Sequence, residues 1–425
     1  MRVAVIGAGW AGCAAAVEAT RLGQQVTVYE SARVPGGRAR RVDLPWPGGT
    51  TVPLDNGQHI LIGAYTETLR LMDDVGVNTS TALLRLPLTL QFPDGTGIVF
   101  PRLPTPLDAL AGILWARGWS WRDKRSLLRA ALGWQLAGFR CAPSLSVAQL
   151  CRGLTPSVMA TLIEPLCVSA LNTPAERASG QVYLRVLRDA LFAQSGGSNL
   201  LLPRVDLSAL LPDAALDWVS QHGGEVRLGH RVQALNLAGS SWRVDGVEVD
   251  RVILACPPGE AARLVQTSGL PCDDWQAQAH ALQFEAITTV YALSPGSRLA
   301  QAMLALPAEG PDGQAPAQFV FDRGQLGGPA GLLALVVSAS QGDSAELTER
   351  VLAQGRRQLG LQTLEAVQTI TEKRATFACL PGLQRPAALV GPGLLVCGDY
   401  VEGPYPATLE GAVRSGLHVA RTAIK

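Results

Sequence analysis

The chain has 425 residues, of which 47% are hydrophobic and 17% charged, and its formal net charge is +1. This length exceeds what one hydrophobic core supports, so we expect at least two domains. A charge so close to zero gives no field that would gather nucleic acid, and we expect no nucleic-acid partner.

The cysteines and histidines show no pattern typical of a metal site. The eight cysteines are scattered without a CxxC pair, and the five histidines have no ligand spacing. Dispersed thiols predict a reducing compartment. No run reaches the roughly 18 apolar residues of a membrane-spanning helix. We therefore expect a cytoplasmic protein without a metal, and leave open a peripheral contact with the inner face of the membrane.

The N-terminus predicts a strand, a helix and a second strand. Arg2–Ile6 is nearly all apolar, as in a buried parallel strand. Ala11–Leu22 is an alanine-rich helix that Gly23 would end, and Gln25–Tyr29 is the next strand. Together these segments form a βαβ unit.

The turn between this strand and helix has the glycine spacing of a dinucleotide-binding fold. Its first glycine allows a tight turn, its second lets the backbone approach a pyrophosphate, and its third lets helix and strand pack closely. The helix N-terminus offers free N–H groups to the phosphates. Glu30 ends the second strand, where its carboxylate can accept the ribose hydroxyls. The predicted contacts are Gly7, Gly9, Trp10, Ala11, Gly12 and Glu30.

A second glycine pair follows the acid, in the segment Gly36-Gly37-Arg38. Adjacent glycines let the chain pass close beside a bulky cofactor. The guanidinium of Arg38 can form bidentate hydrogen bonds with a phosphate. A surface turn with solvated arginines is the alternative for this segment taken alone.

The segment Leu107–Leu136 combines four tryptophans with interleaved arginines and a lysine. Aromatic rings and basic side chains favour the lipid interface, so we consider 107–136 a membrane-docking region. The alternative is an ordinary helix pair whose tryptophans belong to the core.

Strand signals return at Gly224–Leu228, Trp242–Asp245 and Arg251–Ala255. The stretch Leu299–Pro329 is rich in Gly, Pro and Gln and predicts loops. Further segments predict the strands Leu332–Ser338 and Leu394–Gly398 and the helices Ala345–Gly360 and Thr408–Thr422.

The C-terminus supplies a second cofactor-binding segment. An apolar strand ends at Gly398-Asp399, where the acid can accept from a ribityl hydroxyl. A helix then opens near Thr408, its expected N-cap. A helix N-terminus aimed at a flavin ring would stabilise the negative charge of the reduced form. The predicted contacts are Gly398, Asp399, Thr408, Leu409 and Glu410.

The N-terminal glycine segments and the C-terminal segment together resemble the two-part flavin site of the amine-oxidase and phytoene-desaturase flavoprotein superfamily. The resemblance covers the chain from end to end and implies FAD as cofactor. It also implies that Val232 packs beside the adenine.

A narrower resemblance lies in the segment Leu54–Tyr65, which contains the run Asp-Asn-Gly-Gln-His. It is similar to the squalene-associated FAD-dependent desaturase family, the hydroxysqualene dehydroxylases of hopanoid precursor synthesis. The resemblance implies that reduced flavin delivers a hydride from N5 to hydroxysqualene, which gives squalene. It further implies functional coupling to two prenyl-synthase-like enzymes upstream.

Loss of the substrate hydroxyl requires a proton donor, because the C–O bond must loosen before hydride arrives. Asp55 and His59 are candidates, since their segment should pass the flavin, and Tyr405 beside the C-terminal helix is a third. The alternative for Asp55 and His59 is that they anchor the loop by hydrogen bonds.

We expect an α/β fold, with a Rossmann-like FAD-binding domain and an interleaved substrate domain of mixed sheet plus helices. The FAD-binding domain is predicted to combine residues 1–85, 200–265 and 385–425. The substrate domain is predicted to combine residues 86–199 and 266–384.

Three other functions stay open at this point. A carotenoid or isoprenoid desaturase would run FAD in the oxidative direction. A non-catalytic prenyl-lipid escort protein would use the same fold without flavin. An NAD-dependent dehydrogenase would need no C-terminal flavin segment.

Overall fold

A six-stranded sheet joins the two ends of the chain. The computed structural model describes residues 1–46, 49–308 and 315–423. The strand order is β10-β2-β1-β14-β21-β20, in which the first five strands run parallel and β20 is antiparallel. The strands are β1 (Arg2–Ile6), β2 (Gln25–Glu30), β10 (Glu225–Leu228), β14 (Arg251–Leu254), β20 (Leu389–Gly391) and β21 (Leu394–Val396).

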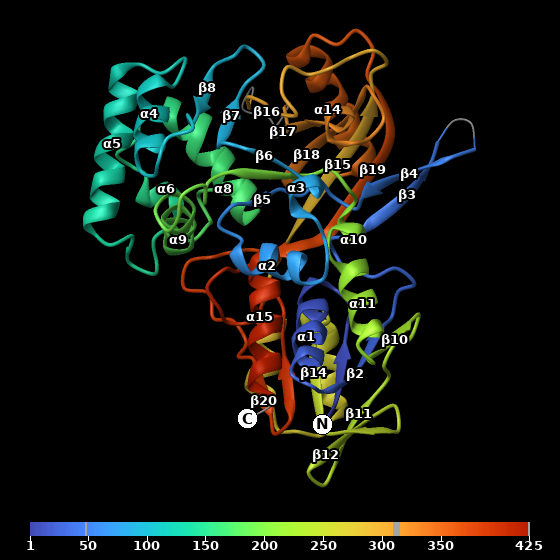
Figure 1. The fold of residues 1–425 in the computed structure, drawn as a ribbon. Coiled ribbons are helices and arrows are strands. Elements are labelled where there is room, and N and C mark those ends of the chain that lie inside the picture. Colours follow the sequence, from blue (N-terminus) through green and yellow to red (C-terminus); the bar gives the residue numbers. More distant parts are fainter. Residues whose placement is uncertain (47–48, 309–314, 424–425) are drawn as a thin grey trace.

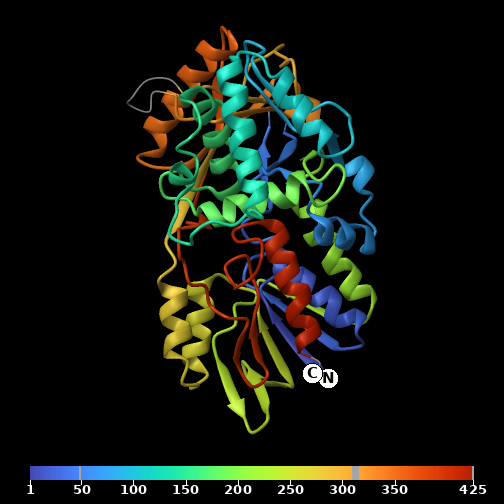
Figure 2. The ribbon, with the colours of Figure 1, turned by 90° about the vertical axis from the view of Figure 1, so that its left-hand side faces the viewer.

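Three helices cover one face of this sheet, namely α1 (Trp10–Arg21), α11 (Pro212–Gln221) and α15 (Leu409–Thr422). Val3 and Val5 point toward them, as the two-residue period of a strand requires. Helices α1 and α15 run side by side, and the two termini of the chain lie next to each other (Figures 1 and 2).

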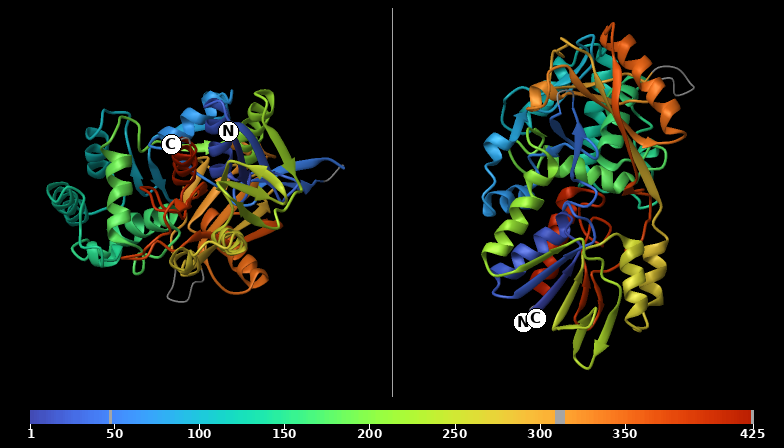
Figure 3. Two further views of the ribbon diagram at one scale, coloured as in Figure 1. Left: turned by 90° about the horizontal axis from the view of Figure 1, so that it is seen from below. Right: turned by 90° about the vertical axis from the view of Figure 1, so that its right-hand side faces the viewer.

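A small antiparallel sheet and two helices lie across the other face, where Ala4 and Ile6 point. The right-hand view of Figure 3 shows the two helices (yellow) on the side of the parallel strands away from α1 and α11. These elements are β11 (Leu235–Ala238), β12 (Ser241–Val244), β13 (Val247–Val249), α12 (Pro258–Thr267) and α13 (Asp273–His280).

An antiparallel sheet of five strands occupies the opposite end of the molecule (Figure 1). Its order is β16-β17-β18-β15-β19, and α14 (Ser344–Leu359) packs on it through an apolar cluster that includes Leu347 and Val351. The strands are β15 (Phe284–Leu293), β16 (Met303–Ala305), β17 (Phe319–Asp322), β18 (Leu332–Ser340) and β19 (Glu365–Phe377).

The rest of this end is built from short strands and a group of helices. The short strands are β3 (Arg41–Pro45), β4 (Thr51–Asp55), β5 (Leu61–Ile62), β6 (Leu83–Leu86), β7 (Thr89–Gln91), β8 (Gly97–Val99) and β9 (Leu200–Pro203). The helices are α2 (Thr66–Asp74), α3 (Thr79–Ala82), α4 (Leu107–Trp115), α5 (Trp121–Leu136), α6 (Val147–Leu150), α7 (Pro156–Val158), α8 (Glu164–Leu171), α9 (Gly180–Leu191) and α10 (Leu207–Leu210).

The predicted α/β class is confirmed, and the prediction of loops over Leu299–Pro329 is wrong in part. Strands β16 and β17 lie within that stretch, because neighbouring strands bury their apolar residues despite the surrounding Gly and Pro. Positions 309–314 of that stretch lie outside the described residues. The division into two interleaved domains at the stated boundaries stays a prediction.

Candidate functional site

The first turn of the chain uses two of its glycines for packing. Gly7 has a φ of +111°, and a Cβ there would lie 2.6 Å from the Ala255 carbonyl oxygen. A Cβ on Gly12 would lie 1.8 Å from the Gly7 oxygen. Both positions therefore require glycine for the backbone and for close helix–strand packing.

Gly9 differs, because the protein's own packing does not require glycine there. Its φ is −75°, and a Cβ would meet nothing nearer than the Cα of Gly37, at 3.9 Å. Gly9 is the N-cap of α1, which has no side-chain cap and no acidic residue in its first turn. The open space and the uncapped N–H groups fit a pyrophosphate.

The second glycine pair lies directly against this turn. Gly36 N–H donates to the Ala8 oxygen at 2.8 Å, and the indole of Trp10 donates to the Ala39 oxygen at 3.0 Å. Gly37 faces Gly9, so two residues without side chains oppose each other. The structure thus brings both predicted glycine segments together.

Glu30 lies where the sequence places an acid, at the end of β2. One carboxylate oxygen accepts from Ala8 N–H at 2.7 Å, and the other accepts from Ala32 N–H at 2.7 Å. The side chain is buried and faces the glycine turn.

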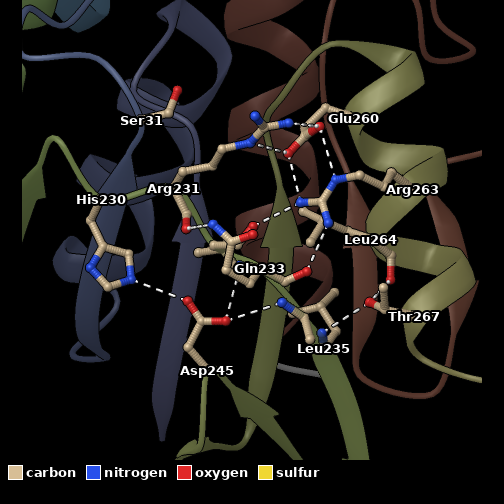
Figure 4. Close-up of polar contacts among 12 residues, drawn as sticks. Ser31, His230, Arg231, Gln233, Leu235, Asp245, Glu260, Arg263, Leu264 and Thr267 are labelled. Carbon is tan, nitrogen blue, oxygen red and sulfur yellow. Dashed lines mark hydrogen bonds and ion pairs between the residues drawn. The ribbon is translucent and has the colours of Figure 1, made fainter.

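A polar network fixes the backbone around Val232, whose own side chain is buried. Arg263 donates to the carbonyl oxygens of Val232 and Gln233 at 2.8 and 2.7 Å and pairs with Glu260. Asp245 accepts from the Gln233 N–H at 2.9 Å. Figure 4 shows the contacts of Arg263 and Glu260 on α12, and of Asp245, with the segment that precedes β11.

The C-terminal segment reaches the N-terminal one through an ion pair. Arg38 donates to Asp399 at 2.5 Å and to the Ala375 oxygen at 2.7 Å. Gly398 N–H donates to Ser415 on α15 at 3.1 Å. The two predicted cofactor segments are thus in direct contact, although they are separated by most of the chain.

Helix α15 begins as the sequence predicts. Thr408 is its N-cap, and its hydroxyl accepts from Gly411 N–H at 2.9 Å. A Cβ on Gly416 would lie 2.1 Å from the Ala11 oxygen, so this glycine lets α15 and α1 pack closely. Leu409 is the first residue of the helix and half-buried.

Glu410 is fully buried, and its carboxylate is bound to the N-terminus of α2. It accepts from the N–H groups of Glu67 and Thr68 at 3.1 and 2.9 Å, from the Thr68 hydroxyl at 2.6 Å and from Arg414 at 2.7 Å. Any contact of Glu410 with a flavin would therefore come from its backbone.

A cavity of about 430 Å³ lies beside this helix. Asp399, Tyr405, Gly411 and Arg414 are among its lining residues. Tyr405 therefore lines the same cavity as Asp399, which pairs with Arg38.

Asp55 is fully buried between β4, α10 and β15. One carboxylate oxygen accepts from Leu207 N–H at 2.8 Å, and its backbone oxygen accepts from the Tyr291 hydroxyl at 2.9 Å. The other carboxylate oxygen has no partner among the described residues. Burial raises the pKa of Asp55 to about 7, although the charge of Arg323 partly offsets it.

His59 folds back on its own loop. Its Nδ1 lies 2.7 Å from the Gly57 oxygen, which can only accept, so Nδ1 carries the proton in the neutral ring. Burial, and to a smaller extent the charge of Arg38, lower the pKa of His59. A neutral ring of this tautomer offers Nε2 as an acceptor.

Tyr405 is half-buried, and the guanidinium of Arg414 lies 5.0 Å from its ring centre. Burial and then the nearby Asp189 carboxylate raise the pKa of Tyr405 above its ordinary value, so its hydroxyl stays protonated near neutral pH as that of an ordinary tyrosine does. Of the three candidate donors, Tyr405 lines the cavity, whereas Asp55 has no exposed surface.

Two arginines with positioning contacts, the buried Arg323 and the partly buried Arg385, were not anticipated from sequence. Arg323 is 3% exposed and donates to the Gln58 side chain at 3.1 Å, which fixes the loop between Asp55 and His59. Arg385 donates to the carbonyl oxygens of Val401 and Gly403. Neither arginine stands in a recognisable motif, so no sequence signal could have found them.

Residues 1–46, 49–308 and 315–423 contain no group of three His, Cys, Asp or Glu side chains that could hold a metal ion. None of their helices combines the length and the hydropathy needed to cross a bilayer.

Comparison with known proteins places the chain among flavoproteins. The family model for flavin containing amine oxidoreductases matches residues 10–424. A hydroxysqualene dehydroxylase of Rhodopseudomonas palustris is 27% identical, over 98% of this chain and 97% of its own length. A probable zeta-carotene desaturase of Synechococcus elongatus is 25% identical, over 62% of this chain and 60% of its own.

The fold has solved counterparts as well. An oxidoreductase of Methanosarcina mazei superposes with a TM-score of 0.72 at 18% identity, over 99% of this chain and all of that one. The full-length family match agrees with the glycine turns and the uncapped helix N-terminus, which fit FAD. The chain belongs to the flavin containing amine oxidoreductase family and is an FAD-dependent oxidoreductase.

Proposed function

We propose that this protein catalyses the reductive dehydroxylation of hydroxysqualene to squalene. The observation that carries the proposal is the extent of the similarity to a hydroxysqualene dehydroxylase, which spans 98% of this chain. The similarity to a carotene desaturase spans 62%. A substrate domain related along its whole length is better support for a shared substrate than a partial match.

FAD, when bound in its reduced form, supplies a hydride from N5 to the substrate carbon. The hydroxyl group leaves as water, so the protein must add one proton to its oxygen. The net change is the replacement of a C–O bond by a C–H bond, with oxidation of the flavin. The residues of the chain have to bind the substrate, exclude water and provide that proton.

Tyr405 is the proton donor that the contacts support best. Its hydroxyl carries a proton near neutral pH, as an ordinary tyrosine does, and burial and Asp189 raise its pKa further. It lines the cavity beside Asp399 and Gly411, at the N-terminus of α15.

Asp55 and His59 serve as positioning residues in this proposal. Asp55 ties the end of β4 to Leu207 and Tyr291, and it has no exposed surface. His59 uses its Nδ1 proton on Gly57 within the same loop. Both contacts hold the loop between β4 and β5 in one conformation.

A single-turnover experiment tests the function. The purified FAD-bound protein is reduced without oxygen, mixed with hydroxysqualene, and followed by flavin absorbance and product analysis. We expect reoxidation of the flavin with one squalene formed per flavin. The oxidative alternative predicts no reoxidation, but reduction of the oxidised protein by an acyclic carotene precursor instead.

Tyr405→Phe tests the proton donor in the same assay. We expect slower turnover at saturating substrate with little change in FAD affinity, because only the hydroxyl is lost. Tyr183→Phe is the matched control, since the Tyr183 hydroxyl has no hydrogen-bond partner among the described residues. Equal rates in both variants would remove Tyr405 from the mechanism.

A further inference from the structure

The helical hairpin formed by α4 and α5 carries an unusual concentration of exposed apolar side chains. Of the fourteen large hydrophobic side chains exposed in the described part of the chain, eight lie between Val99 and Leu136. The hairpin stands at the edge of the molecule, away from the six-stranded sheet (Figures 1 and 3). Apolar groups gathered at one place mark a contact surface rather than random exposure.

Helix α4 is packed so that its apolar side faces outward. A Cβ on Gly112 would lie 2.5 Å from the Phe100 ring, so the glycine side of α4 lies against the protein. Leu107 and Trp115, on other sides of the helix, are 55% and 67% exposed. The only charged residue of α4, Asp108, is buried, so its exposed surface carries no charged side chain.

The four tryptophans of the region fall into two classes. Trp119 is buried and donates to the Thr161 hydroxyl at 3.0 Å, and Trp134 packs against the core. Trp115 and Trp121 are exposed, the latter by 69%. Trp119 and Trp134 therefore fit the core alternative, whereas the exposure of Trp115 and Trp121 leaves the docking interpretation a prediction.

The same region is strongly basic. Residues 107–136 hold five Lys and Arg against two Asp and no Glu, a net charge of +3 in a chain that carries +1. Asp123 is buried and accepts hydrogen bonds from Ser120 and Thr155, and its negative charge is already included in this net charge. The exposed basic residues beside the apolar side chains are Arg117, Arg122, Arg125 and Arg129.

We propose that this surface docks on a bilayer of anionic phospholipids. The docking face consists of Leu103, Leu107, Leu110, Trp115 and Trp121 as the inserting side chains and Arg117, Arg122, Arg125 and Arg129 as the headgroup contacts. Amphipathic aromatic rings settle at the level of the headgroups, and apolar side chains reach the acyl boundary. Positive side chains around them complement an anionic surface.

The proposed function gives this face a purpose, since squalene and its precursors reside in bilayers. The binding itself does not depend on that function. A protein docked by α4 and α5 would take its substrate from the membrane without a spanning segment.

Vesicle sedimentation tests the proposal on the FAD-bound full chain without substrate. Vesicles of phosphatidylglycerol with phosphatidylcholine should carry the protein into the pellet, and vesicles of phosphatidylcholine alone should carry much less. Trp115→Ser with Trp121→Ser should lower the partition coefficient roughly tenfold or more. Arg122→Gln, Arg125→Gln and Arg129→Gln should each lower it by up to about fivefold at low salt.

Leu237→Ser with Val247→Ser is the control. These side chains are also large, apolar and exposed, by 44% and 45%, but they lie on β11 and β13, outside the docking face. This variant should bind vesicles like the original chain. Flavin absorbance and the unfolding temperature of every variant show whether it is folded. Binding that no docking-face variant changes would overturn the proposal.

A second copy of the chain is the competing occupant of this face. If sedimentation velocity shows a dimer that the double tryptophan variant dissociates, and the original chain leaves vesicles unbound, the face is a dimer interface and the proposal is wrong. Failure of the proposed function appears separately, as inactivity of the original chain on hydroxysqualene dispersed in detergent. Vesicle binding would be unaffected by that result.

Discussion

Arg38 donates a hydrogen bond to Asp399, a residue 361 positions further along the chain, at 2.5 Å. This ion pair joins the turn after β2 to the turn after β21, the two segments that the sequence assigns to one cofactor. Both strands belong to the same parallel sheet, with β1 and β14 between them, so the sheet brings their carboxyl ends to one edge. Ligands of open α/β sheets bind at that edge.

Replacement of Asp399 by Asn should weaken FAD binding about tenfold. The change removes the charge that orients Arg38, and hydrogen bonds to charged groups contribute about 1.5–3 kcal/mol. Titration of the apoprotein with FAD, followed by flavin fluorescence, measures the dissociation constant. Arg33→Ala, on the exposed part of the same turn, is the control and should bind FAD normally. An unchanged dissociation constant for Asp399→Asn would show that the pair has no part in the site.

Two glycine substitutions separate cofactor binding from folding. Gly9→Ala should leave the free energy of unfolding of the apoprotein within about 1 kcal/mol, because its Cβ meets only open space. Its FAD affinity should fall by roughly tenfold, equivalent to about 1.4 kcal/mol, since the methyl group takes the place of the approaching phosphate.

Gly12→Ala, by contrast, should destabilise the apoprotein by about 3 kcal/mol or more, because its Cβ would lie 1.8 Å from the Gly7 oxygen. Chemical denaturation and FAD titration of both variants provide the comparison. The interpretation of Gly9 fails if its alanine variant binds FAD as tightly as the original chain.

Glu410→Gln should lower the free energy of unfolding by about 2–3 kcal/mol, because it leaves Arg414 without its charged partner and weakens the bonds to the α2 N-terminus. Glu67→Gln is the control. It breaks a partly exposed pair with Arg70 and should cost less than about 1 kcal/mol. If both variants lost the same free energy of unfolding, the contacts of Glu410 with α2 would not be important for stability.

The sequence predicts the parts of this site that depend on local pattern. Strand β1 has the predicted bounds, α1 is shifted by one residue at both ends, and α15 begins one residue later than predicted. Glycine spacing and apolar runs carry this information because each acts over a few residues. The N-cap role of Thr408 is confirmed for the same reason.

Contacts between distant segments were beyond sequence reasoning. Glu410 was expected beside the flavin, yet its carboxylate binds α2, more than 300 residues away in the chain. The buried Arg323 pairs with Gln58, at a separation of 265 residues. Local sequence patterns do not predict which buried polar groups contact each other, since that depends on how the sheets and helices assemble.

The stability of the protein should depend on the protonation of Asp55. Its folded pKa is raised to about 7, above the ordinary 3.8 that applies when the chain is unfolded. Between these values the folded state binds more protons at Asp55 than the unfolded one, so the stability that Asp55 contributes is greatest below about pH 4 and is lost as pH rises through about 7. Asp55→Asn resembles the protonated form and should lack this fall.

The free energy of unfolding of the original chain, minus that of Asp55→Asn, should therefore fall by on the order of a few kcal/mol between pH 5 and pH 8. Denaturant unfolding of both proteins at several pH values measures this difference. The contributions of all other titrating groups cancel, because the two proteins share them. A difference that is constant with pH would mean that the Asp55 carboxyl has an ordinary pKa.

The central claim is that this flavoprotein works reductively, and the origin of the new hydrogen in the product tests it most directly. The anaerobically reduced protein is transferred to D₂O, where the hydrogen at flavin N5 exchanges with solvent, and hydroxysqualene is then added for one turnover. Mass spectrometry should find squalene with one deuterium, at the carbon that lost the hydroxyl. Squalene without deuterium, or no squalene while the flavin stays reduced, would contradict the account.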